Sequence, residues 1–220
     1  MNNLIRIVLP LHLVLVISSN LFSQQPEFSA QVLFGPTGYI LENTENVSFS
    51  QKFNYSLGGY LQFNIPVQES RISIRSGYFI DTKRYDQHYS NTLSWLTKRA
   101  STSFTYGNIP LLFGVQFNIK NKFYPFISLG LIFGHLISED QIRELNDGTI
   151  SHGFLSRSSN LENPNDLYVG FGMNFRLTKV VLIRVETFLS HQLNQGSGYN
   201  QDRFGRTSFG LKAGTQFYFF

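Results

Sequence analysis

Gln62-Phe63-Asn64-Ile65 closes a run of alternating apolar and small or polar residues, and three other stretches close in the same way. These are Gln116-Phe117-Asn118-Ile119, Asn174-Phe175-Arg176-Leu177 and Gln216-Phe217-Tyr218-Phe219. Successive side chains on a strand point to opposite faces, so one face of each run is apolar and finishes on Phe. Aromatic residues at one end of alternate strands predict the periplasmic girdle of a membrane β-barrel. Its predicted members are Phe63, Phe117, Phe175 and Phe217.

The N-terminus is typical of a secretory signal peptide. A short segment with one positive charge, Met1 to Arg6, precedes an apolar stretch of 11 residues from Ile7 to Ile17. That stretch is too short to cross a bilayer as a helix, which needs about 20 residues. We therefore expect a signal peptide at 1–23 and one barrel domain at 24–220, although Leu21 is large for its place before the cut.

The composition excludes several classes of site. The chain has no cysteine, which rules out disulfides, thiolate metal sites and a lipid-modified N-terminal cysteine. Its formal charge is +4, or +3 once Arg6 leaves with the leader, and so mild an excess gives no argument for nucleic acid. Phe is abundant, at 22 of 220 residues, while the mean hydropathy is −0.10. Alternating apolar and polar faces produce this combination.

Eight strands are predicted from the alternation. They run over Phe28–Phe34, Tyr55–Ile65, Arg71–Thr82, Thr105–Ile119, Phe123–Ile137, Leu167–Leu177, Val181–His191 and Thr207–Phe219. Short turns at Pro66–Ser70, Lys120–Lys122 and Thr178–Val180 alternate with long polar loops at Gly35–Lys52, Tyr85–Ser103, Ser138–Asp166 and Gln192–Arg206. Short periplasmic turns and long extracellular loops describe outer-membrane barrels. The prediction is an all-β, eight-stranded antiparallel up-and-down transmembrane barrel.

The face opposite the apolar one carries charge as well as glycine. Its charged members are Arg71, Arg75, Arg176, Arg184, Glu186 and Lys212. Because buried charges need partners and an eight-stranded barrel has room only for side chains, we expect a polar network that plugs the lumen. A narrow conduction path is the alternative. A secreted soluble barrel that binds an apolar ligand remains a rival, since its apolar face would point inward.

The order of the segments resembles the PorT-like outer-membrane β-barrel family across nearly the whole mature chain. The matching segments are Tyr106-Gly107-Asn108-Ile109-Pro110-Leu111-Leu112, Lys122-Phe123-Tyr124-Pro125-Phe126, Leu129-Gly130-Leu131, Val169-Gly170-Phe171-Gly172-Met173-Asn174-Phe175, the pair Arg184 and Glu186, and Gly210 to Phe220. The resemblance implies the fold and an outer-membrane location. Some members of that family are linked to a protein secretion system, a role that strand patterns do not transfer.

The C-terminus also resembles that of outer-membrane barrels, which end on an aromatic residue that the barrel assembly machinery recognises. Phe220, with Tyr218 two places before it, supplies such a signal. The lipid-facing frame of the last strand nevertheless runs through Phe217 and Phe219, one residue out of register.

The sequence gives only weak signals for two candidate chemical sites, one at two histidines and one in a long loop. His135 and His191 are expected to face lipid near the extracellular end, as in lipid A deacylase barrels, yet Phe188-Leu189-Ser190-His191 misplaces the Phe and Ser of that family's local pattern. The predicted third long loop carries acidic residues whose spacing matches no calcium loop. These loop residues, with one histidine, are Glu139, Asp140, Glu144, Asp147, His152, Glu162 and Asp166.

We therefore expect a non-catalytic protein of the bacterial outer membrane, without cofactor or metal. Its partners would be outer-membrane lipid, the assembly machinery and other envelope proteins. Its role would be binding or shielding by the surface loops, or a place in an envelope assembly. An outer-membrane lipid-modifying enzyme is the alternative.

Overall fold

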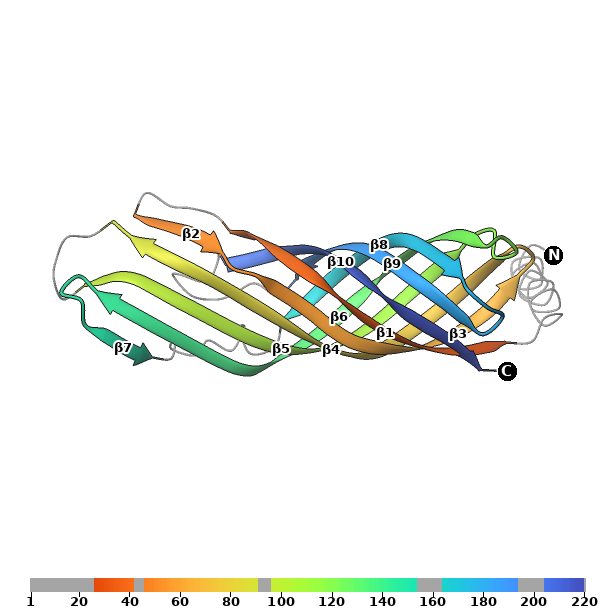
Figure 1. Cartoon of the computed structure of the whole chain (residues 1–220), viewed down its shortest axis with the longest axis horizontal. Helices are drawn as coiled ribbons and strands as arrows, with labels where there is room; N and C mark the ends of the chain where they lie inside the picture. The colour runs from red at the N-terminus through yellow and green to blue at the C-terminus, as the bar shows by residue number, and fades with distance from the viewer. Residues whose placement is uncertain (1–25, 42–45, 91–95, 154–163, 194–203, 220) are drawn as a thin grey trace, which may run out of the picture.

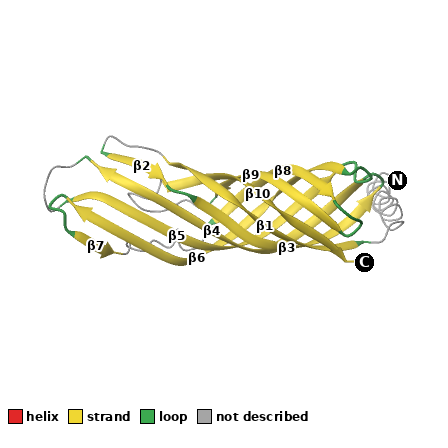
Figure 2. Cartoon of the chain, viewed as in Figure 1, coloured by secondary structure: helices red, strands yellow, loops and turns green. Residues whose placement is uncertain are grey.

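The computed structural model describes residues 26–41, 46–90, 96–153, 164–193 and 204–219. The predicted leader at 1–23 and Phe220 lie outside this range. The described regular structure is β-strand throughout, drawn in yellow in Figure 2. Within the same residues, no helix is long and apolar enough to cross a bilayer.

Eight strands form a closed antiparallel ring (Figure 1). In ring order they are β1 (Glu27–Leu41), β3 (Asn54–Val67), β4 (Ser70–Tyr89), β5 (Thr97–Gln116), β6 (Phe123–Leu145), β8 (Asn165–Arg176), β9 (Val181–Gln192) and β10 (Phe204–Phe219). The first and last of these close the ring, in a register that runs from Phe28 opposite Phe219 to Leu41 opposite Phe204. The predicted fold class is confirmed.

The turns at one end of the ring are short, as predicted. Gln68, between β3 and β4, has a φ of 55°, and Asn118, between β5 and β6, has a φ of 53°. Left-handed backbone of this kind lets a chain reverse tightly, and Asn tolerates it better than most residues. We call this the short-turn end. β5 stops at Gln116, so the predicted strand end at Ile119 is wrong by three residues.

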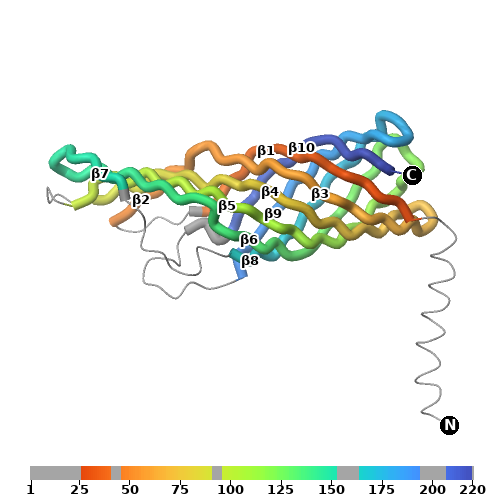
Figure 3. Tube along the Cα trace, turned by 90° about the horizontal axis from the view of Figure 1, so that it is seen from below, coloured from red at the N-terminus to blue at the C-terminus, as the bar shows by residue number. Residues whose placement is uncertain are grey.

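The predicted long loops are wrong in part, because much of three of them is strand. β4, β5 and β6 continue past the ring, and β2 (Val47–Gln51) and β7 (Ile150–Gly153) pair with their far ends. The result is a five-stranded sheet that stands out from one side of the barrel, clearest in Figure 3. We call it the extension. Its two faces both carry polar residues, interrupted on one face by Tyr85 and Phe104, so the sequence shows no steady apolar alternation that would mark it as strand.

Candidate functional site

The outer face of the ring is apolar on every strand. One strongly exposed residue from each ring strand, in ring order, is Val32, Leu61, Ile74, Phe113, Leu129, Phe171, Ile183 and Leu211. Leu61 is 71% exposed and Phe171 63% exposed. A continuous apolar belt of this extent is far larger than the patches that soluble monomers leave open to water. The outside of this barrel is therefore built to contact an apolar medium.

Aromatic side chains edge the belt at the short-turn end. The structure places all four residues of the predicted girdle on the outer face, and Phe117 lies just after β5. Phe63 packs on Phe28 with ring centroids 5.1 Å apart, and Phe175 packs on Phe123 at 5.2 Å. These two neighbours enlarge the girdle from four residues to six. Phe28 and Phe123 were not predicted for the girdle, although alternation along their strands places both side chains on the outward face.

Inside the ring, opposite charges meet at mid-height. Arg75 on β4 donates from Nη1 to Glu186 Oε2 on β9 at 2.8 Å, and its Nη2 also bonds Glu186 Oε1. Arg184 Nε lies 3.2 Å from the same Oε2. All three side chains are at most 2% exposed. The carboxylate thus bridges two guanidinium groups, which offsets part of the cost of burying them.

Two neutral groups, missed by the sequence analysis, complete this cluster. Tyr168 OH donates to Glu186 Oε1 at 3.0 Å, and Ser128 Oγ donates to the same oxygen at 3.0 Å. Ser128 also accepts from Arg75 Nη2 at 2.8 Å. A side chain at Gly170 would collide with this arrangement, since its Cβ would meet Glu186 Oε1 and would lie 2.8 Å from Ser128 Oγ. Gly170 is therefore what makes room for the carboxylate.

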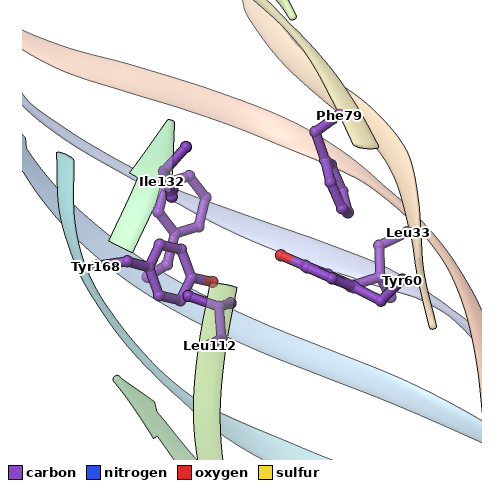
Figure 4. Close-up of a cluster of buried hydrophobic side chains, with 7 residues drawn as sticks. Leu33, Tyr60, Phe79, Leu112, Ile132 and Tyr168 are labelled. Carbon is purple, nitrogen blue, oxygen red and sulfur yellow. The ribbon is translucent and has the colours of Figure 1, made fainter. Parts of the chain in front are cut away.

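Next to the cluster, one side chain from every ring strand packs across the lumen. Seven form a buried hydrophobic cluster, of which Figure 4 labels all but Phe188: Leu33, Tyr60, Phe79, Leu112, Ile132, Tyr168 and Phe188. The eighth strand contributes Lys212, whose Nζ lies 4.4 Å from the ring centroid of Phe79 and 4.5 Å from that of Phe188. We call this layer the diaphragm. It closes the lumen at its level, since its residues are packed and buried.

The six charged residues predicted for one lumen network are split between levels. Arg75, Arg184 and Glu186 form the cluster, and Lys212 lies in the diaphragm. Arg71 and Arg176 instead lie near the short-turn end. Arg71 pairs with Glu27 at 2.7 Å, and Arg176 Nη2 donates to the carbonyl of Ile119.

The histidines point outward, and among the described residues their side-chain partners are a tyrosine and a threonine. His135 Nε2 lies 3.3 Å from Tyr78 OH, and His191 Nδ1 lies 2.9 Å from Thr207 Oγ1. Ser190 is on the opposite face from His191 and donates to Asp166 at 3.2 Å. A nucleophile and its base must lie within hydrogen-bond reach, so Ser190 and His191 cannot act as such a pair.

The carboxylates of the predicted third loop do not gather. In the described residues, no group of three or more His, Asp or Glu side chains could hold a metal ion. Glu144 lies on β6 and is 3.4 Å from Lys98, Asp147 Oδ1 accepts from the backbone of Thr149 at 2.8 Å, and Asp166 lies on β8. Glu139 and Asp140 are also on β6, His152 is on β7, and Glu162 lies outside the described residues.

On the extension, Asp86 ties three strands together. Lys52 Nζ, just after β2, lies 2.8 Å from its Oδ1, and Arg99 Nη2 on β5 lies 2.5 Å from its Oδ2. Burial raises the pKa of this carboxyl, but hydrogen bonds from Lys52, Arg99 and Ser101 outweigh it and lower the pKa from 3.8 to about 2. On the other face, Tyr85, Phe104 and Tyr106 form a buried cluster. The extension is thus a packed sheet with its own small core.

One comparison with a solved structure supports the fold, and two weaker likenesses are reported beside it. The outer membrane protein OprG from Pseudomonas aeruginosa matches with a TM-score of 0.51 and 11% identity, over 89% of this chain and 97% of that one. Neisserial surface protein A matches at 0.44 with 12% identity, over 88% and 99%. Outer membrane protein W of E. coli matches at 0.39 with 10% identity, over 89% and 99%. No family model and no curated protein matches the sequence.

Proposed function

We propose that this chain is an integral, non-catalytic barrel of the bacterial outer membrane that acts at the cell surface through its extension. The observation that carries the proposal is the distribution of polar and apolar side chains between the two faces of the barrel wall. It is the reverse of the distribution in a soluble barrel. Charges meet inside, at Arg75 and Glu186, while apolar side chains cover the outside. Such an apolar exterior requires lipid around it. The closed ring of strands can lie in a bilayer because it leaves no backbone group unpaired there.

The height of the belt fits a bilayer. On β3 the outward apolar run extends from Tyr55 to Ile65. Ten steps of about 3.4 Å, on a strand tilted by about 45°, rise about 24 Å, close to the roughly 25 Å band of outer-membrane barrels. Tyr55 and Phe34, with ring centroids 6.3 Å apart, would lie at the upper edge, and Phe63 and Phe28 at the lower.

The closed lumen favours a surface role over transport. The diaphragm and the charge cluster fill the ring at two successive levels, and beyond the diaphragm a cavity of about 20 Å³ remains, lined in part by Asp81, Lys83 and Lys212. That is room for about one water molecule. A soluble barrel would need an apolar chamber in the lumen, and the charge cluster and the packed rings occupy that space. In contrast, the extension offers binding partners a five-stranded sheet that stands out beyond the ring.

Membership of the PorT-like family, and with it a place in an envelope assembly, is the finer version of this proposal. It rests on the resemblance of the strand patterns. A lipid-modifying enzyme is the rival function, and it would use His135 or His191. Their partners, Tyr78 and Thr207, give it little support, because in the part of the chain that the structure describes neither arrangement includes a carboxylate that could orient the histidine.

The first experiment is gel mobility of the detergent-extracted membrane fraction, with and without boiling. A closed barrel resists SDS until heated, because its hydrogen bonds close on themselves with no free edge. We expect a shift on boiling. Protein found soluble in the periplasm, with one mobility, would refute the lipid-facing assignment.

Two further measurements test the role. A peptide tag inserted between β4 and β5 should bind antibody on intact cells, and labelling only after the outer membrane is opened would reverse the proposed orientation. Replacing both His135 and His191 by Ala should leave the mass of lipid A unchanged in cells that overproduce the protein. A mass difference between the two strains would establish the enzyme instead.

A further inference from the structure

A cluster of three cations lies on the outer face of the extension, just above the apolar belt. Its members are Lys52, just after β2, Arg84 on β4 and Arg99 on β5, and the acid Asp86 lies among them. We call it the basic cluster. We infer that it binds the phosphate groups of an anionic lipid in the outer leaflet of the surrounding membrane. The inference rests on the proposed outer-membrane location and adds a ligand class to it.

The face and the height of Arg84 both suit a lipid headgroup. Arg84 is four residues beyond Ile80 on β4, so its side chain points to the outward face on which Ile80 is exposed. Four residues on a strand tilted by about 45° rise about 10 Å, and Thr82 lies midway. A bilayer adds roughly 5–7 Å of headgroup on each side of its hydrocarbon core. With the edge of the hydrocarbon between Ile80 and Thr82, Arg84 lies at the level of the phosphates.

The backbone holds Lys52 directly opposite Arg84. β2 pairs with β4 as far as Gln51, and one residue later the backbone N–H of Lys52 donates to the carbonyl of Arg84 at 3.0 Å. The buried side chain of Asn54 fixes both backbones, since its Nδ2 donates to the Lys52 carbonyl at 2.9 Å and its Oδ1 accepts from the Arg84 N–H at 2.5 Å. Opposite residues of an antiparallel pair project to the same face, and like charges placed there repel. An anion bound between Lys52 and Arg84 would remove that repulsion.

The acid in the cluster is already shared by the other two cations. Lys52 Nζ lies 2.8 Å from Asp86 Oδ1, and Arg99 Nη2 lies 2.5 Å from Asp86 Oδ2. Within the described residues, the guanidinium of Arg84 lies 5.9 Å from the ring centroid of Tyr55 and forms no ion pair. The charge of Arg84 is therefore available to a ligand.

The next acid on the outer face does not reach Arg84. Ser103 on β5 is the register partner of Arg84, and Asp140 on β6 is the register partner of Ser103. Two strand spacings separate the acid from the cation, which is about 10 Å. The basic cluster thus has three positive charges against one negative charge, and it attracts an anion.

Aromatic side chains beside the basic cluster indicate that the anion belongs to a lipid. Phe53, next to Lys52 in the chain, is 68% exposed. Tyr55, whose ring lies under Arg84, packs on Phe34 at the upper edge of the belt, with ring centroids 6.3 Å apart. A lipid carries its phosphate directly above its acyl chains, so one molecule can contact the cations and these rings together. A soluble anion could use only the cations.

The test is a lipid-binding titration of the protein refolded in non-ionic detergent micelles, at physiological ionic strength and without divalent cations. Native mass spectrometry counts the molecules bound. The probes are lipid A with two phosphates, the same lipid after both phosphates are removed, and inositol hexakisphosphate as a soluble anion. We expect the phosphorylated lipid to bind at least about tenfold more tightly than the dephosphorylated one, since each cation beside an anionic lipid contributes roughly a fivefold effect. We expect inositol hexakisphosphate to bind more weakly than the phosphorylated lipid.

Matched variants assign the binding to the basic cluster. Arg84→Gln and Lys52→Gln should each weaken binding of the phosphorylated lipid roughly fivefold, whereas Arg84→Lys keeps the charge and should retain most of the affinity. Lys98→Gln serves as the control, because Lys98 is another exposed cation of the extension that pairs with Glu144 at 3.4 Å and lies farther from the belt. Arg84 forms no ion pair among the described residues, so Arg84→Gln should fold normally.

The shift on boiling separates this inference from the proposed function. If parent and variants all shift, equal binding of the two forms of lipid A would overturn the inference and leave the membrane location standing. Tighter binding of inositol hexakisphosphate than of phosphorylated lipid A would assign the cluster to a soluble anion and would also overturn it. Unchanged binding in Arg84→Gln, or an equal loss in Lys98→Gln, would place the bound lipid elsewhere. A parent protein without the shift would refute the membrane location, and the inference with it.

Discussion

Arg75 and Glu186 join opposite walls of the barrel. Arg75 lies on β4 and Glu186 on β9, and in the ring of eight these strands are four places apart in either direction. Their side chains nevertheless meet at 2.8 Å between Nη1 and Oε2. The pair therefore braces the barrel across its full width, where backbone hydrogen bonds connect only adjacent strands.

Removing the carboxylate of this pair should destabilise the barrel strongly. Glu186→Ala leaves Arg75 and Arg184 buried without their acid, which costs about 3–5 kcal/mol in the free energy of unfolding. Urea unfolding of the refolded protein measures the loss. Glu69→Ala is the control, because its ion pair with Lys120 is exposed and such pairs contribute about 1 kcal/mol or less. Equal unfolding midpoints for the two variants would contradict a bracing role.

Gly170 should tolerate no side chain. In Gly170→Ala the new Cβ would press on the Glu186 carboxylate and on Ser128 Oγ, and such overpacking costs about 1–3 kcal/mol. The same urea experiment checks this. Val169→Ala, on the outer face of the same strand, does not touch the cluster and serves as the comparison. The idea fails if Gly170→Ala is as stable as the parent protein.

The diaphragm should keep the protein from conducting ions. We expect no steady conductance from the purified protein in planar bilayers, since buried side chains from all eight strands fill the lumen. The double variant Phe79→Ala, Phe188→Ala removes two of the rings and should admit water at the diaphragm, but it should still carry no steady current, because Arg75, Arg184 and Glu186 continue to fill the next level. Long-lived channels formed by the parent protein would show that the diaphragm opens.

The carboxyl group of Asp86 should titrate at low pH. Its pKa is lowered to about 2, so it is ionised throughout the range of ordinary growth media. Since the folded pKa lies below the ordinary value, its stabilising contribution is complete above about pH 4 and declines as the pH falls towards 2. Carboxyl carbon NMR measures the pKa directly. In Arg99→Gln it should move upward, because a hydrogen bond to the ionised form is lost, whereas an unchanged value would exclude that cause.

Alternation allowed the ring strands and their outward faces to be predicted, because one face meets an apolar medium and the other does not. Along Tyr55–Ile65 and Leu167–Leu177, the predicted strands agree with β3 and β8 to within a few residues. The same logic failed on the extension. There, a sequence such as Arg84-Tyr85-Asp86-Gln87 carries polar groups on both faces beside a single aromatic residue, so it has the composition of a loop while it pairs as strand.

The inward direction of the lumen charges could be predicted, but not their partners. Alternation gives the face of Arg75 and of Glu186 separately. That they meet depends on the ring's closure and diameter, which no local pattern encodes. Arg71 was predicted for the same network, yet it binds Glu27 on β1 because it lies four residues, or two inward positions, nearer the short-turn end. The height of a residue along the barrel axis therefore decides its partner.

Because β1 pairs with β10, the ring of this barrel cannot close until its last strand is present. Phe28 and Phe219 are register partners, so the final seam joins residues from the two extremes of the described chain. Closing so long a loop is entropically costly and slow. Until β10 is in place, β1 and β9 each present an unpaired edge. A nascent chain stalled before β10 would expose two unpaired strand edges, and each could pair with another chain and start aggregation. The sixteen residues of β10 therefore cover both edges, and the ring can close only after this strand has been synthesised.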